Sequence, residues 1–281
     1  MAIVSFWSDS EKETGQTLAS VAIATLMAIN HNFKILEVAT GFKDRTVENC
    51  FWEQEKDDTL KDILGTRTRD VGMNNGIEGL VKVLQSNRTS TNVVADYAKV
   101  VFRERLDVLV APSTTHRDAY DSITQYYPEL VKIADKNYNI VFIDIDKRMK
   151  EEHKRAILQA SDAIVITFKQ GMDSLNEFDR LREKNPIFKM NRSLLLLGKY
   201  DRYSKYNTKN TSRYLKESRT ISAISYNTLF GEAASEGKVA DYFLKYRSLT
   251  DQTDKNVLFI QEAKKTCDNI LFKLKELQAK V

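Results

Sequence analysis

The sequence predicts an α/β protein with a doubly wound, mainly parallel sheet and helices on both faces. Short apolar segments rich in β-branched residues recur along the chain, and their apolar residues are consecutive instead of alternating. This pattern is typical of strands buried in a parallel sheet. Segments with helical periodicity lie between them, as parallel crossovers require. The expected strands are 2–7, 34–39, 107–113, 139–146, 162–168, 193–200 and 221–227, and the expected helices are 17–30, 76–86, 119–136, 150–160 and 173–184.

The domain organisation follows from length and from the absence of linker-like composition. A chain of 281 residues is long enough for one large α/β domain, and it has only three prolines and no Pro/Gly/Ser-rich segment. We expect a single domain over 1–281, with insertions in the charged region 42–106. A long amphipathic helix at about 254–280 closes the chain. Docking of this helix on the sheet is the favoured interpretation, and binding to a membrane surface is the alternative.

Composition indicates an ordinary globular protein of the cytoplasm. The formal net charge of +4 permits anionic partners without requiring them. No segment approaches the roughly 18 to 20 apolar residues of a membrane span, and the first residues lack the pattern of a signal peptide. Cys50 and Cys267 are too isolated for a metal site, so we expect reduced thiols.

The loop after the first strand resembles a phosphate-binding loop. The pattern G-x-x-x-x-G-K-[ST] is matched by Ser10, Gly15, Gln16 and Thr17, so its lysine is replaced by glutamine. Backbone N–H groups at the start of the next helix would still face an anion, although a neutral amide binds phosphate more weakly than an ammonium. The alternative is a strand-to-helix turn without a ligand. The candidate nucleotide-binding residues are Lys12, Glu13, Thr14, Gly15, Gln16, Thr17 and Leu18.

Asp144 is the candidate magnesium partner of Thr17. It ends the buried segment 139–146, and the carboxyl ends of parallel strands meet at one edge of the sheet. The alternative is that Asp144 only caps a loop or pairs with a neighbouring Lys or Arg. Asp146, two residues later, is expected to begin a helix among solvated charges.

The segment 199–219 is a second candidate site. It holds seven basic residues against two acidic ones, with tyrosines between them. Such a segment can bind phosphate backbones or other anions, whereas the simpler interpretation is a solvated surface. The candidate residues are Lys199, Arg202, Lys205, Lys209 and Arg213.

With these motifs in order, the chain resembles the ParA/MinD family of deviant Walker A ATPases over nearly its whole length. The family's K-G-G-x-G-K-T loop is similar to "EKETGQT", with Glu11 at the signature lysine and Gln16 at the phosphate lysine. The family's Asp-x-Asp switch is similar to "KILEVATGFKD", with Ala39 and Gly41 at the two aspartates. Both lysines and both acids are therefore replaced.

Later segments extend the resemblance. The strand "NIVFIDID" places Asp144 at the family's Walker B aspartate, which supports Mg²⁺ through water. In "SLLLLGKYD", Gly198 replaces the asparagine that contacts adenine. The segment "ISAISYNTLFGEAASEG" is similar to the family's "IPYN…EA…G" region, with Ser225 in place of proline.

The resemblance implies a P-loop fold, ATP or ADP with Mg²⁺ as cofactor, and a working homodimer. The phrases "SYNTLFGEAASEG" and "ADYFLKY" are most similar to TadZ/CpaE-type proteins, which help to place pilus or secretion machinery. We therefore expect a positioning or assembly factor that is at most a slow ATPase. Two alternatives stay open: a DNA-partitioning ATPase in which Lys12 compensates for the missing lysines, and an interaction scaffold that has lost nucleotide binding.

Overall fold

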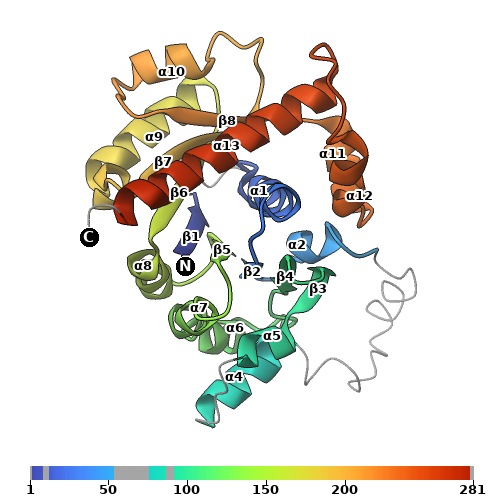
Figure 1. The fold of residues 1–281 in the computed structure, drawn as a ribbon. Coiled ribbons are helices and arrows are strands. Elements are labelled where there is room, and N and C mark those ends of the chain that lie inside the picture. Colours follow the sequence, from blue (N-terminus) through green and yellow to red (C-terminus); the bar gives the residue numbers. More distant parts are fainter. Residues whose placement is uncertain (1, 9–12, 54–75, 87–91, 279–281) are drawn as a thin grey trace.

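The apolar segments form one sheet (Figure 1). The structure, a computed structural model, describes residues 2–8, 13–53, 76–86 and 92–278. The strands are β1 (Ala2–Trp7), β2 (Ile35–Ala39), β3 (Lys99–Phe102), β4 (Leu106–Leu109), β5 (Ile140–Asp144), β6 (Ala163–Phe168), β7 (Ser193–Tyr200) and β8 (Ile221–Ser225). They lie in the order β3-β4-β2-β5-β1-β6-β7-β8, and every neighbouring pair is parallel except β3 with β4. The predicted fold class is confirmed.

The edge strand β3 was not among the expected strands. It lies inside 42–106, where the sequence indicated charged loops, and its Lys99 and Val100 are exposed. A short edge strand with one solvated side lacks the long apolar segment that marks the interior strands.

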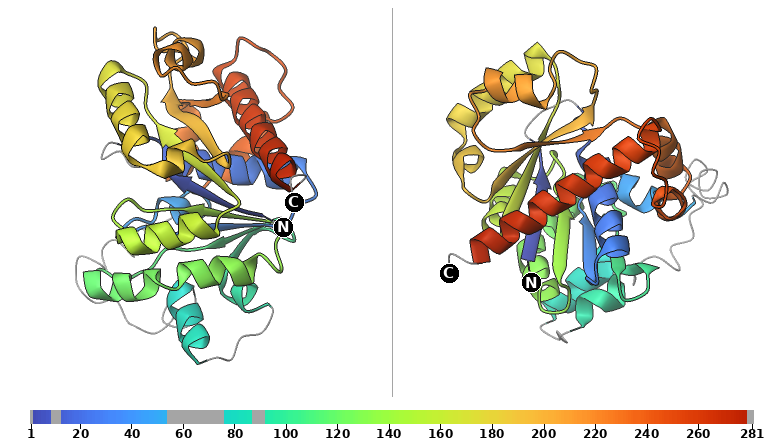
Figure 2. Two further views of the ribbon diagram at one scale, coloured as in Figure 1. Left: turned by 90° about the vertical axis from the view of Figure 1, so that its left-hand side faces the viewer. Right: turned by 45° about the horizontal axis from the view of Figure 1, so that its top comes forward.

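One face of the sheet is covered by helices from both ends of the chain. Along β1, Ala2, Val4 and Phe6 point into this core, which also contains residues of α1 and the terminal helix. Figure 2 shows the sheet lying between this layer and the layer on the opposite face. The helices of the first layer are α1 (Gln16–Asn30), α2 (Thr46–Asn49), α11 (Thr228–Ser235), α12 (Val239–Tyr246) and α13 (Lys255–Gln278).

The opposite face carries the second core. Ile3 and Trp7 of β1 point into it, which is the alternation a strand imposes on consecutive apolar side chains. The remaining helical elements are α4 (Ile77–Gln85), α5 (Val93–Tyr97), α6 (Arg117–Thr124), α7 (Tyr127–Ala134), α8 (Glu151–Ala160), α9 (Met172–Lys184), the 3₁₀ turn η1 (Pro186–Lys189) and α10 (Thr208–Tyr214).

The single helix expected over 119–136 is wrong, because the structure divides it into α6 and α7. Pro128 lies in the first turn of α7. A proline there lacks the N–H that would continue the ladder from the preceding turn, so it suits the start of a new helix and not the interior of a long one.

The terminal helix α13 packs on the sheet beside β8 and against α1 (Figure 1). Its buried stripe includes Val257, Ile260, Ala263, Cys267 and Ile270. Because α13 covers α1, ten consecutive residues of α1, Ala19 to Ala28, are buried. In the part of the chain that the structure describes, no helix is both long and apolar enough to cross a membrane.

Candidate functional site

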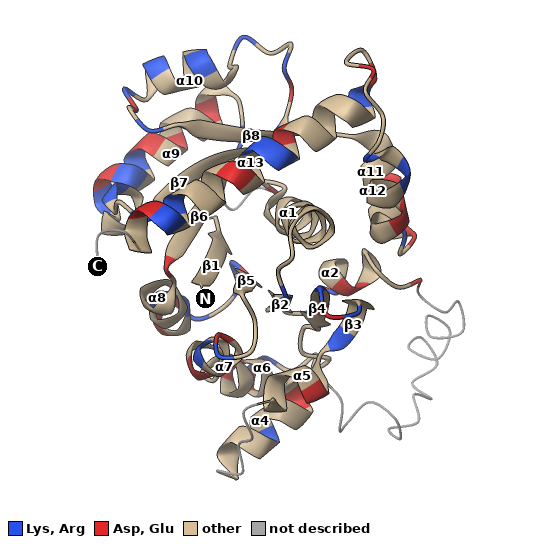
Figure 3. Cartoon of the chain, viewed as in Figure 1, with Lys and Arg blue, Asp and Glu red and all other residues tan. Residues whose placement is uncertain are grey.

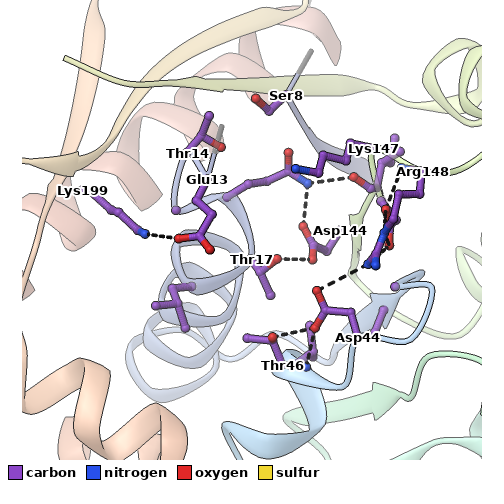
Figure 4. Close-up of a pocket in the computed structure, with 18 residues that line it drawn as sticks. Ser8, Glu13, Thr14, Thr17, Asp44, Thr46, Asp144, Lys147, Arg148 and Lys199 are labelled. Atoms are coloured by element: carbon purple, nitrogen blue, oxygen red, sulfur yellow. Dashed lines mark hydrogen bonds and ion pairs between the residues drawn. The ribbon is translucent and has the colours of Figure 1, made fainter. Parts of the chain in front are cut away.

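A cavity of about 320 Å³ opens at the carboxyl ends of β1, β2 and β5, around the first turn of α1. The strand β1 lies between β5 and β6, so the loop that leaves it emerges at the middle of the sheet. Figure 4 shows side chains from this loop, from the segments after β2 and β5, and from the end of β7 converging on the cavity. This is the edge at which open α/β sheets bind ligands.

The loop residues predicted from the motif line the cavity wherever they are described. They are Glu13, Thr14, Gly15, Gln16, Thr17 and Leu18, whereas the predicted Lys12 lies outside the described residues. Gly15 has φ +80°, a left-handed conformation that glycine adopts without strain. The N–H of Ala19 closes the first turn on the carbonyl of Gly15. The preceding N–H groups of α1 therefore have no carbonyl within the helix.

Asp144 forms the floor of the cavity and connects β5 to α1. Its Oδ2 accepts a hydrogen bond from the Thr17 hydroxyl at 2.7 Å, and its Oδ1 accepts one from Gln16 Nε2 at 2.7 Å. Gln16 Nε2 also donates to the carbonyl of Ile145 at 2.9 Å. Burial raises the pKa of Asp144 to about 6, and the hydrogen bonds from Gln16 and Thr17 oppose that rise.

Thr17 and Asp144 fit the requirements of a magnesium ion bound together with phosphate. Mg²⁺ prefers oxygen ligands and usually keeps several waters, with one or two carboxylates and substrate phosphates completing its shell. A hydroxyl and a carboxylate side by side on the cavity floor provide such oxygens. The described residues hold no group of three or more His, Cys, Asp or Glu that could bind a metal without a ligand.

Asp146 does not begin a helix among solvated charges, so that expectation is wrong. Its side chain is 5% exposed, pairs with Arg148 at 2.6 Å, and accepts the backbone N–H of Phe42 at 2.6 Å. Arg148 also lies 3.7 Å from Asp44. These contacts join the segment after β5 to the segment after β2 and form one wall of the cavity (Figure 4).

Lys199 belongs to the cavity, although the sequence grouped it with the basic segment 199–219. It lines the cavity and its Nζ lies 2.9 Å from Glu13 Oε2. The other predicted residues of that segment are exposed and do not line the cavity, and Figure 3 shows basic residues along α10. They are Arg202, Lys205, Lys209 and Arg213.

Lys147 and Arg148 also line the cavity, and no sequence motif had assigned them a role. Their position directly after the Asp144–Asp146 segment was the available signal, because residues that follow a buried parallel strand emerge at the ligand-binding edge. The charged composition after Asp146 indicated a solvated segment instead.

The structure also shows where the residues lie that depart from the motifs of the resembling family. Ala39 and Gly41 line the cavity, so neither position carries an acid there. Gly198 is buried against the loop, and a β-carbon on it would lie 2.1 Å from the carbonyl oxygen of Thr14. Ser225 donates its backbone N–H to Glu262 of α13 at 2.9 Å.

Comparison with known proteins places this geometry in a known fold. No protein-family model matches the chain, and no curated protein matches it in sequence. Among solved structures, a ParA family ATPase from Chlorobium tepidum is similar over 97% of this chain and 98% of its own, with a TM-score of 0.67 and 14% identity. The chain has the fold of the ParA/MinD ATPases.

Two further structures of this fold are similar over almost their full lengths. The septum site-determining protein MinD from Pyrococcus horikoshii, complexed with Mg-ADP, has a TM-score of 0.63 at 14% identity, covering 97% of this chain and 98% of that one. MinD in the MinC:MinD cell division complex of Aquifex aeolicus has a TM-score of 0.58 at 15% identity, covering 96% of both chains. At these identities the likeness establishes the ParA/MinD fold, while residue roles rest on the cavity itself.

Proposed function

We propose that the chain is a ParA/MinD-like nucleotide-binding protein with a degenerate phosphate loop, acting as a positioning or assembly factor. The observation that carries this proposal is the Thr17–Asp144 contact on the floor of a cavity at the first turn of α1. An anion there would face backbone N–H groups and the positive end of the helix dipole.

The proposed ligand is ATP or ADP with Mg²⁺. Backbone N–H groups of residues 12–17 would hold the phosphates, with Thr17 and Asp144 holding the metal. The metal would neutralise phosphate charge at the position where the loop motif has a lysine and this chain has the neutral Gln16. The MinD from P. horikoshii was solved with Mg-ADP, which supports this choice of ligand.

Hydrolysis is proposed to be slow or absent. Phosphoryl transfer depends on cationic stabilisation of the transferring group and on a residue that orients the attacking water. Gln16 contributes no charge, and neither Ala39 nor Gly41 can orient water as an acid would. Asp44 also lines the cavity, but its carboxylate accepts from Thr46 at 2.9 Å and 2.6 Å and lies 3.7 Å from Arg148.

We further propose a cytoplasmic homodimer, formed by a single domain over 1–281, that places pilus or secretion machinery in the manner of TadZ/CpaE-type proteins. The phrases "SYNTLFGEAASEG" and "ADYFLKY" support this assignment. The expected behaviour in solution is dimer formation promoted by Mg-ATP, which light scattering with and without nucleotide measures. A protein partner is part of the proposal, and the A. aeolicus MinD was solved with such a partner, MinC.

A thermal melt with Mg-ATP, Mg-ADP, adenosine or Mg²⁺ alone tests nucleotide binding directly. A ligand present at a hundred times its Kd adds about 2.7 kcal/mol to the free energy of unfolding, which raises the Tm of a domain of this size by a few degrees. We expect this shift with both nucleotides and not with Mg²⁺ alone. Absence of a shift at millimolar nucleotide contradicts the proposal and favours an interaction scaffold without a ligand.

A DNA-partitioning ATPase is the second candidate, because the basic segment after β7 is exposed together with aromatic side chains. Tyr203 is 87% exposed and lies beside Arg202 and Lys205. Phosphate contacts of this kind weaken steeply as salt rises. Retention of the protein on DNA at low salt, lost at higher salt and lost in Arg202→Gln/Lys205→Gln, supports this candidate. No retention at low salt eliminates it.

A further inference from the structure

Lys199 forms an ion pair across the mouth of the cavity with a residue of the phosphate loop. Its Nζ lies 2.9 Å from Glu13 Oε2, and the two residues are separated by most of the chain. Glu13 remains 84% exposed and Lys199 36% exposed, so neither charge is buried. The pair therefore places a solvent-accessible cation and a solvent-accessible anion on the lining of the cavity.

The local backbone directs Lys199 toward the loop. The pairing of β7 with β8 becomes irregular between Leu197 and Tyr200, and Lys199 itself has φ +49°. A left-handed conformation is unusual for a residue with a β-carbon and turns the side chain out of the strand's ordinary alternation. The side chain then crosses Gly15, where an added β-carbon would lie 3.0 Å from Lys199 Cγ.

Further positive charge surrounds Glu13. Lys147 follows β5 and Lys169 follows β6, the two strands that flank β1. The hydrogen bond and charge of Lys199 lower the pKa of Glu13 below its usual range, and the charges of Lys169 and Lys147 lower it further. Glu13 therefore sits as an anion among cations supplied by the ends of neighbouring strands.

We propose that Lys199 supplies the phosphate-binding charge that position 16 lacks, and that Glu13 is a resident counter-ion which an incoming phosphate group displaces. This inference rests on the proposed nucleotide function and adds to it the source of the cation. Among the described loop residues 13–17 no side chain is cationic, and Lys199 is a lysine from another element that lines the same cavity and contacts this loop.

Lys199 and Glu13 carry opposite charges, so replacing each of them should change nucleotide affinity in opposite directions. Removing Lys199 removes a charge-assisted contact to the phosphates, and a contact of this kind contributes about tenfold or more to affinity. Removing the charge of Glu13 eliminates its competition for Lys199. Because an exposed ion pair is weak, that gain is smaller, about two- to fivefold.

The experiment is titration calorimetry of the full chain with Mg-ATP, and with tripolyphosphate as a probe that lacks the base. The variants are Lys199→Gln, Glu13→Gln and the double variant, with Lys132→Gln, an exposed position on α7, as a control of equal charge change. Lys12→Gln tests the lysine that belongs to the loop itself. Thermal melts without ligand verify that each variant is folded.

We expect weaker binding of both probes by Lys199→Gln, tighter binding by Glu13→Gln, and wild-type binding by Lys132→Gln. In the double variant the gain from Glu13→Gln should disappear, because its only proposed effect is competition for Lys199.

Two results overturn the inference while leaving the proposed function standing. One is ATP binding that is unchanged in Lys199→Gln, with loss of binding in Lys12→Gln then assigning the charge to Lys12, and the other is equal weakening by Lys199→Gln and Lys132→Gln. If neither wild type nor Glu13→Gln binds either probe, the proposed function and the inference both fail.

Discussion

The carbonyl oxygen of Thr14 lies only 2.1 Å from the position that a β-carbon on Gly198 would take. Real β-carbons do not approach another heavy atom this closely, so the loop before α1 can lie against β7 only because position 198 is glycine. Gly198 is thus part of the packing that positions Thr14 beside the cavity.

Gly198→Ala is therefore expected to displace the loop. Overpacking of this kind costs about 1 to 3 kcal/mol of stability, and Mg-ATP affinity should fall because Thr14 and its neighbours line the cavity. Urea denaturation and calorimetry measure the two effects. Gly231→Ala is the control, since nothing lies within 4 Å of its added β-carbon and it lies within α11; there alanine should stabilise by about 0.5 to 1 kcal/mol. Wild-type stability of Gly198→Ala contradicts the packing described here.

The mainly parallel sheet and the floor of the cavity could be predicted from the sequence because both follow from strand pattern, whereas the order of the strands was not predicted. Consecutive apolar residues identify interior parallel strands, and parallel strands bring their carboxyl ends to one edge. Asp144 and Thr17 were placed together on this argument, and the structure puts them 2.7 Å apart.

The side walls of the cavity could not be predicted in the same way. Lys199 reaches the loop through a left-handed residue and a register irregularity, which no periodicity in "SLLLLGKY" signals. Asp146 is buried by Arg148 and by the backbone of Phe42, a residue distant in sequence. Local patterns report burial along an element, whereas these contacts depend on which loops meet in space.

Gln16→Lys should raise affinity for Mg-ATP. The glutamine amide now donates to Asp144 and to the carbonyl of Ile145, so a lysine would lie beside the cavity floor and add a full positive charge for phosphate. A charge-assisted contact is about twice as strong as a neutral one, and we expect roughly tenfold tighter binding by calorimetry. Gln125→Lys, an exposed position at the end of α6, is the control for net charge. Equal tightening in both variants, or none in either, refutes the placement of the loop.

Asp144→Asn and Thr17→Val should each remove the dependence of nucleotide binding on Mg²⁺. Asparagine keeps the shape of Asp144 but not the carboxylate that suits a hard cation, and valine lacks the hydroxyl oxygen. Affinity for ATP measured with Mg²⁺ should fall about tenfold, whereas affinity measured with a chelator should change little. Asp179→Asn on α9 serves as the control. If Mg²⁺ still strengthens binding in both site variants, the metal is held elsewhere.

Glu37, a buried carboxyl of β2 close enough to Asp144 to sense its charge, is expected to make stability depend on pH. It is fully buried on β2, its Oε1 accepts from the Ser20 hydroxyl at 2.5 Å, and its Oε2 has no hydrogen-bond partner among the described residues. Burial raises the pKa of Glu37 to about 8, the Ser20 hydrogen bond opposes this, and the charge of Asp144 adds to it. Burial raises the pKa of the Cys50 thiol, and the charge of Glu37 raises it further.

The direction of this pH dependence follows from the numbers of protons bound by the folded and the unfolded chain. Between the ordinary glutamate pKa of 4.5 and the raised value of about 8, folded Glu37 keeps a proton that the unfolded chain releases, so the free energy of unfolding falls as pH rises. The slope approaches about 1.4 kcal/mol per pH unit. Asp144, with a pKa of about 6, also makes the free energy of unfolding fall as pH rises, but mainly below pH 6. The change in stability between pH 6 and 8 therefore comes chiefly from Glu37.

Glu37→Gln should therefore flatten the decline in stability between pH 6 and 8 and be more stable than wild type at pH 8. The neutral amide has no proton to lose and still accepts from Ser20, so the cost of ionising a buried group disappears. Urea denaturation across this interval measures both slopes. Glu104→Gln, an exposed residue paired with Lys34, is the control and should keep the wild-type slope. A slope that is the same in all three proteins means that Glu37 is already ionised in the folded state.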